Sequence, residues 1–294
     1  MYGSTSPSLH WDEVGGTWVG GQFLDGRVNG QRTQALKPFL GELEMNNPDP
    51  LVIIEKIRNG EYASDFQRVY GSKIFDNPVT AFLKVGDAIQ AFEASDRFSP
   101  FDSRYDRYLE GRAQLTLREK RGREIFERQD KGNCAACHVS KPNADGSQRP
   151  LFTDFSYDNL GVPRNPENRF YTLVGSLNPE GRSYIDKGLG LTVKDAGQDG
   201  KFKVPSLRNI ERTGPYMHNG YFKTLRGVIA FYNTRDVLPK CINDWATEEE
   251  ALALKCWPRA EVERNVNHEE LGHLGLSGEE VADLLAFLHT LNDE

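Results

Sequence analysis

Three residues near the middle of the chain have the types and the spacing to hold a redox cofactor. Cys134, Cys137 and His138 stand in the order C-x-x-C-H. Two thiols three positions apart on one helical turn can each bond a vinyl group of one porphyrin, and the histidine that follows lies below the iron as its proximal ligand. The motif therefore predicts one covalently attached haem c.

Two other functions of a C-x-x-C pair fit less well. A zinc site needs a second pair of ligands at matching spacing, but Cys241 and Cys256 have fourteen residues between them. A thioredoxin-like site needs a βαβ context, which the sequence pattern lacks. Haem attachment takes place outside the cytoplasm, where disulfides also persist. We therefore interpret Cys241 and Cys256 as a disulfide that closes a local loop, in preference to two free buried thiols.

The ligand on the other face of the iron has several candidates C-terminal to the motif, namely Met217, His218 and Tyr232. Methionine raises the reduction potential and suits electron transfer, whereas tyrosine lowers it and favours high oxidation states. Tyr232 also lies on the apolar stripe of a predicted helix, where an ordinary core tyrosine is equally expected. The residues alone leave this choice open.

Apolar periodicity and capping signals predict the helices that must position these residues. The predicted helices lie at 34–40, 50–70, 79–94, 117–128, 224–233 and 277–291. Capping boxes begin two of them, at Thr116-x-x-Glu119 directly before the haem motif and at Ser277-x-x-Glu280. Residues 139–203 are predicted to be mostly loop, with a turn at Asp145-Gly146. A helix before C-x-x-C-H and a helix at the C-terminus is the arrangement of a small cytochrome c fold. We therefore expect a mainly α chain with a cytochrome c-like haem domain and long loops at 105–294.

Composition excludes two classes of partner. The 36 basic and 43 acidic residues are well mixed and give a net charge of -7, whereas a nucleic-acid surface needs clustered basic charge. Apolar runs such as 51–54 are too short to span a bilayer. The opening residues MYGSTSPSLHWDE lack the basic and apolar regions of a signal peptide. An exported protein would therefore be a mature or cut form, or one whose upstream sequence is missing.

Four stretches resemble the bacterial di-haem cytochrome c peroxidase family, including its MauG-type members. The first is GGQFLDGR (20–27), followed by Gln34 and by Glu44-Met45. The others are CAACH (134–138), KVPSLRNIERTGPYMHNGYFKTL (203–225) and LGLSGEEVADLLAFLHTLND (274–293). The resemblance implies a di-haem architecture in which residues 1–104 are the remainder of a second, peroxidatic cytochrome c-like domain. It also implies that the haem on His138 is the second haem, which passes or stores oxidising equivalents.

Further roles follow from the resemblance position by position. Gln34 and Glu44 match the residues that handle peroxide and protons. The distal ligand stands fourteen residues after the histidine of P-Y-x-H, which is Tyr232 here, and Met217 is the alternative. His218 then lies near the haems without binding iron. The implied partners of the haem propionates are Arg208 and Lys203. The implied ligands of a calcium ion are the carbonyls of Thr213 and Pro215.

The chain departs from the family at three places. No C-x-x-C-H stands before Pro7-Ser8-Leu9, the family's bridging tryptophan is Leu24, and its calcium-binding asparagine is Thr5. The chain is therefore interpreted as a fragment, as part of a split protein whose second haem-bearing polypeptide is separate, or as a one-haem descendant.

The implied function is peroxide-linked electron transfer through the haem on His138, in the periplasm or otherwise outside the cytoplasm, with an electron-donor protein as partner. The alternative is a mono-haem electron-transfer subunit without peroxidase activity.

Overall fold

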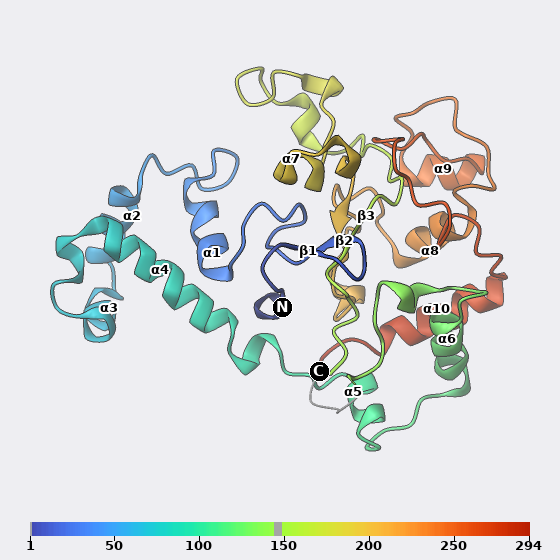
Figure 1. Cartoon of the computed structure of the whole chain (residues 1–294), viewed down its shortest axis with the longest axis horizontal. Helices are drawn as coiled ribbons and strands as arrows, with labels where there is room; N and C mark the ends of the chain where they lie inside the picture. Colours follow the sequence, from blue (N-terminus) through green and yellow to red (C-terminus); the bar gives the residue numbers. More distant parts are fainter. Residues whose placement is uncertain (1, 144–148) are drawn as a thin grey trace. The chain divides into compact units, whose positions relative to one another are not determined.

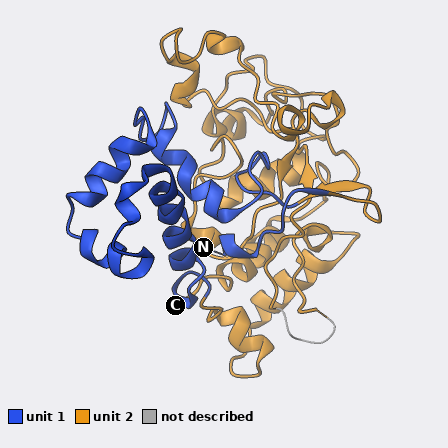
Figure 2. Ribbon diagram, turned by 60° about the vertical axis from the view of Figure 1, so that its left-hand side comes forward, with its two compact units in different colours: residues 1–10, 20–99 blue, residues 11–19, 100–294 orange. Residues whose placement is uncertain are grey.

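A computed structural model describes residues 2–143 and 149–294, which form two compact units (Figures 1 and 2). Unit 1 comprises residues 1–10 and 20–99, and unit 2 comprises residues 11–19 and 100–294. The turn predicted at Asp145-Gly146 lies outside the described residues. No helix among the described residues is long and apolar enough to cross a membrane.

Unit 1 is helical. Its elements are η1 (Gly3–Thr5), α1 (Gln31–Leu40), α2 (Pro50–Arg58), α3 (Ala63–Tyr70), η2 (Ile74–Asp76), α4 (Pro78–Glu93) and η3 (Asp96–Phe98). α2 and α4 each begin with proline at the first turn behind an Asp49 or Asn77 cap, the arrangement that satisfies free backbone N–H groups. α1 and α2 pack on α4. Gly86 permits this approach, because a Cβ there would lie 2.8 Å from the Arg32 carbonyl oxygen.

The prediction of one continuous helix over 50–70 is wrong. The segment forms two helices, and α2 ends at a cap on Asn59, directly before Gly60. Glycine inside a helix costs about 1 kcal/mol relative to alanine, so Gly60 favours this break. In α2, Ile53 and Ile54 are buried, whereas Leu51 is 49% exposed.

Unit 2 contains most of the chain and has helices separated by long loops. Its strands are β1 (His10–Asp12, whose first residue falls in unit 1), β2 (Thr17–Val19), β3 (Tyr157–Asp158) and β4 (Phe202–Lys203). Its α-helices are α5 (Arg104–Leu109), α6 (Leu117–Glu127), α7 (Leu189–Val193), α8 (Leu225–Thr234), α9 (Glu248–Leu254) and α10 (Gly278–His289). Short 3-10 turns are η4 (Cys134–Ala136), η5 (Arg169–Thr172), η6 (Gly181–Ser183), η7 (Ala196–Gln198) and η8 (Ile210–Arg212). β1 pairs with β2, and β3 pairs antiparallel with β4.

The α6–α10 pair forms the centre of unit 2. Both helices begin with the predicted capping boxes, at Thr116 and at Ser277. They touch at Gly122, where a Cβ would lie 1.9 Å from the Asp283 carbonyl oxygen. Phe126 and Phe287 meet edge to face beside this contact, with ring centroids 5.3 Å apart. The mainly helical fold that the sequence predicts is confirmed, and α6 leads directly into the C-x-x-C-H turn.

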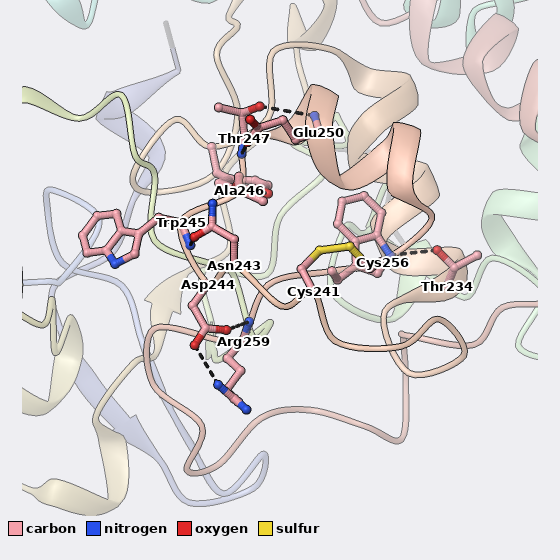
Figure 3. Close-up of a disulfide and its surroundings, with 12 residues drawn as sticks. Thr234, Cys241, Asn243, Asp244, Trp245, Ala246, Thr247, Glu250, Cys256 and Arg259 are labelled. Carbon is pink, nitrogen blue, oxygen red and sulfur yellow. Dashed lines mark hydrogen bonds and ion pairs between the residues drawn. A yellow bond between two sulfur atoms is a disulfide. The ribbon is translucent and has the colours of Figure 1, made fainter.

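The predicted disulfide between Cys241 and Cys256 is present, with an S–S distance of 2.00 Å. Both half-cystines are buried and belong to an apolar cluster that includes Trp257, which we call the Trp257 cluster. The disulfide closes a loop that carries α9 and Trp245 (Figure 3).

Candidate functional site

The C-x-x-C-H motif forms one tight turn after α6. Asn133 takes a left-handed backbone conformation, and η4 follows it. The backbone N–H groups of Cys137 and His138 both donate to the Cys134 carbonyl oxygen. Both thiols are free and half-buried. Burial raises the pKa of each thiol to about 12, and nearby acidic groups add to the shift at Cys137. The thiols are therefore protonated, the form that adds across a vinyl group.

His138 is held with one ring nitrogen engaged. Its Nδ1 lies 2.8 Å from the Phe152 carbonyl oxygen, so Nδ1–H donates and Nε2 keeps its lone pair. Burial lowers the pKa of His138, and this effect is opposed by hydrogen bonds to the backbone of Phe152 and Pro205 and by the charge of Asp154. A neutral imidazole with a free Nε2 is the form that binds a metal ion. The donor set of two free thiols and one oriented imidazole fits a covalently attached haem.

Tyr232 lies on α8 and packs against the apolar cluster that contains Trp257 and the disulfide. Burial raises the pKa of its hydroxyl, and electrostatic interactions with the Cys134 and Cys137 thiols raise it further. The fold thus brings this phenol close to the motif from almost 100 residues further along the chain. Met217 packs against the same cluster and has a left-handed backbone conformation. The choice of Tyr232 over Met217 as distal ligand stays a prediction.

Arg208 is already paired within unit 2. Its guanidinium donates to both carboxylate oxygens of Asp106 at 2.8 Å and to the Pro150 carbonyl oxygen. Burial alone would raise the pKa of Asp106, but the hydrogen bonds and charge of Arg208, with hydrogen bonds from Ser103, lower it overall. The side chains of Arg208 and Asp106 are 1% and 0% exposed. Lys203, the other predicted propionate partner, lies on β4.

His218 stacks on Phe202, with ring centroids 3.6 Å apart and an angle of 5° between the planes. Its Nε2 lies 3.7 Å from Glu261 Oε2. Among the described residues, neither of these two buried atoms has a hydrogen-bond partner. Sequence reasoning found His218 through the P-Y-x-H pattern but missed Glu261, which stands in a loop without a recognisable motif.

The remaining predicted site residues are exposed or half-buried. In unit 1, Gln34 is half-buried on α1 and Glu44 is exposed on the turn after it. In unit 2, the candidate calcium ligands Thr213 and Pro215 are exposed. The described residues contain no group of three or more His, Cys, Asp or Glu side chains arranged to hold a metal ion. The roles of these four residues stay predictions.

The Phe152 carbonyl is the other functional group that the sequence did not reveal. It orients His138 from fourteen residues away, and a backbone oxygen carries no residue-type signal. Phe152 itself is fully buried in the α6–α10 core, so the same packing that stabilises the core places this oxygen.

Three comparisons place the chain among known proteins. The family model described as "Di-haem cytochrome c peroxidase" matches residues 7–114. The methylamine utilization protein MauG of Paracoccus denitrificans is 36% identical over 299 residues, which cover 99% of this chain and 72% of that protein. The cytochrome-c peroxidase IdrP2 of Denitromonas iodatirespirans is 30% identical, with 98% of this chain and 70% of that protein covered.

A solved structure agrees with these relatives. The crystal structure of the diheme peroxidase BthA from Burkholderia thailandensis superimposes with a TM-score of 0.78 at 31% identity, covering 98% of this chain and 69% of that one. Together with the C-x-x-C-H turn and the helix pair beside it, these similarities show that the chain belongs to the di-haem cytochrome c peroxidase family, to which MauG is related.

Proposed function

We propose that this chain is a c-type haem redox protein that passes electrons from a donor protein toward hydrogen peroxide. The observation that carries the proposal is the turn in which two free thiols adjoin a histidine whose Nδ1 is held by the Phe152 carbonyl oxygen. A haem bound here supplies an iron centre that changes its oxidation state by one electron. Cys134 and Cys137 would hold the porphyrin, and His138 would bind the iron from below.

The surrounding residues tune and insulate this site. The Phe152 carbonyl keeps the imidazole of His138 in one tautomer and orientation. Tyr232 is proposed as the second ligand of the iron, and its ring packs, partly buried, against the apolar cluster around α8. A tyrosine ligand lowers the reduction potential relative to methionine, which suits a centre that stores oxidising equivalents.

Gln34 and Glu44 are proposed to act on peroxide, with the carboxylate of Glu44 moving a proton between the two peroxide oxygens. Their position after Asp25-Gly26-Arg27, as in the family pattern, supports this role. We expect Glu44→Gln to lower peroxide turnover roughly a hundredfold, the usual size of a general acid–base contribution. Glu42→Gln is the matched control, because Glu42 is exposed on the same turn. Equal losses in both variants would refute the role of Glu44.

A second haem is proposed to come from outside these residues, on further sequence or on a second haem-bearing polypeptide. Calcium held by the Thr213 and Pro215 carbonyls and an extracytoplasmic location complete the proposal. The names of the relatives, which are peroxidases and MauG proteins, favour peroxide chemistry over a mono-haem carrier. The presence of the disulfide supports the oxidising location.

The decisive experiment combines intact mass with a pyridine haemochrome count on the purified protein, followed by mixing with peroxide. We expect one covalent haem, which is lost in Cys134→Ser/Cys137→Ser. When the sequence or polypeptide that carries the second haem is present, we expect peroxide to change the haem spectrum. A protein without covalent haem would refute the haem assignment. A haem protein whose spectrum ignores peroxide under these conditions would refute the peroxidase function.

A further inference from the structure

A buried carboxylate in unit 2 lies outside the haem motif and has an unusual set of partners. Glu261 is 3% exposed at its side chain. Its Oε1 accepts a hydrogen bond of 2.9 Å from the Tyr171 hydroxyl and one of 3.3 Å from the Asp186 backbone N–H. The Arg164 Nε lies 3.6 Å from the same oxygen. Burying a carboxylate is costly unless it is well paired, and here its shortest bond comes from a neutral phenol.

Tyr171 is placed for one-electron chemistry by this bond. The residue lies on η5 and is 5% exposed. A phenol that loses an electron becomes a strong acid, so oxidation is easy only where a base can accept the proton at once. Glu261 Oε1 lies within the 2.6–3.2 Å that proton transfer requires. Tyr221 offers the contrast, because its buried hydroxyl donates to the Ala246 carbonyl oxygen, which is not a base.

A second aromatic ring joins Tyr171 to the surface. The indole of Trp245 meets the Tyr171 ring edge to face, with centroids 5.1 Å apart and an angle of 89°. Trp245 is half-buried and stands in the loop closed by the disulfide, with its ring directed away from the sulfur atoms (Figure 3). The disulfide thus restrains the loop that holds this ring.

The charges around Trp245 decide whether the oxidised ring is that of Trp245 or that of Tyr171. The guanidinium groups of Arg182 and Arg164 lie 4.4 Å and 5.6 Å from the indole centroid. A cation beside the ring stabilises the neutral indole and disfavours a positive charge on it. Oxidised Tyr171 gives up its proton to Glu261 and stays neutral, so the vacancy rests on Tyr171 and only passes through Trp245.

We propose that Tyr171 and Glu261 form a proton-coupled redox pair, and that Trp245 conducts electrons to it from a one-electron donor at the surface. In the oxidising step Tyr171 loses one electron, its O–H bond breaks and the proton moves to Glu261 Oε1. A neutral phenoxyl radical and a neutral carboxyl group result. In the reducing step one electron from the donor arrives through Trp245, and the proton returns to the phenol. The electron acceptor is the peroxide-oxidised protein, so the inference rests on the proposed function.

The test compares the holoprotein with Tyr171→Phe, Glu261→Gln, Trp245→Phe and the control Tyr221→Phe. Each is labelled with ring-deuterated tyrosine and oxidised either by peroxide or by a photogenerated ruthenium(III) complex, and the radical is followed by EPR. We expect a tyrosyl signal in the wild type and the control, and its loss in Tyr171→Phe. Glu261→Gln should form the signal roughly a hundredfold more slowly. Trp245→Phe should form it normally with peroxide but be reduced more slowly by an added one-electron donor.

Two outcomes separate this inference from the proposed function. A Tyr171 signal with the ruthenium oxidant but none with peroxide would sustain the redox pair and count against the peroxide chemistry. A peroxide-induced change of the haem spectrum, with the same radical in Tyr171→Phe as in the wild type, would overturn the redox pair alone. A normal rate of radical formation in Glu261→Gln would overturn the proton coupling.

Discussion

Arg208→Met leaves the Asp106 carboxylate buried without the cation that faces it. In the folded protein two bonds of 2.8 Å join these side chains, which are 1% and 0% exposed. Breaking a buried ion pair by removing one partner costs about 3–5 kcal/mol, because the remaining charge is uncompensated. We expect the free energy of unfolding of unit 2 to fall by about that amount near neutral pH. Removing both charges, in Asp106→Asn/Arg208→Met, should restore only part of it, because Arg208 also lies 3.9 Å from the buried carboxylate of Asp293.

The loss depends on pH in a direction that the structure sets. In the wild type the pKa of Asp106 lies below its ordinary 3.8, so its stabilising contribution is complete above that value and is lost as the pH falls below it. Without Arg208, burial raises the pKa of Asp106 above its ordinary value. The variant then relieves its penalty by protonation, and its deficit relative to the wild type should shrink as the pH falls through the raised pKa.

Urea denaturation followed by circular dichroism measures both effects, at neutral and at mildly acidic pH. Arg259→Met is the matched control, because its partner Asp244 and its own side chain are 41% and 59% exposed (Figure 3). An exposed pair contributes about 0–1 kcal/mol. An equal, small loss in both variants, or a deficit of Arg208→Met that grows as the pH falls, would refute the reasoning.

Three further predictions concern the haem ligand, the helix contact and the disulfide. Tyr232→Phe should abolish a tyrosinate charge-transfer band and raise the haem potential, whereas an unchanged spectrum would assign the ligand to Met217. Gly122→Val should lower the free energy of unfolding, measured by urea denaturation, by about 3 kcal/mol or more, because the valine side chain would overlap the backbone of α10. A variant as stable as the wild type would contradict the close contact. Cys241→Ala/Cys256→Ala should lose about 3 kcal/mol, the chain-entropy value for a loop of this length. Denaturation with and without reductant measures this loss, and a wild-type protein that ignores reductant would contradict it.

Much of the local structure was predictable from the sequence because its causes are local. The capping boxes at Thr116 and Ser277 each close within four residues, so their residue types alone predict where α6 and α10 begin. The same holds for the backbone of the C-x-x-C-H turn, where the N–H groups of Cys137 and His138 both donate to the Cys134 carbonyl oxygen. The prediction at 50–70 failed at Gly60, where the backbone breaks between α2 and α3 although a single helix was expected.

The tertiary structure alone decided which distant groups meet. Phe152 orients His138 with a backbone oxygen, and Arg208 finds Asp106 across 102 positions. Tyr171 and Glu261 are 90 positions apart, in segments with no helical or strand period to place them. Loop routes depend on which buried polar groups satisfy one another in the folded chain, and no short pattern encodes that. The haem motif was therefore readable from the sequence, while the surroundings that tune it were set by packing.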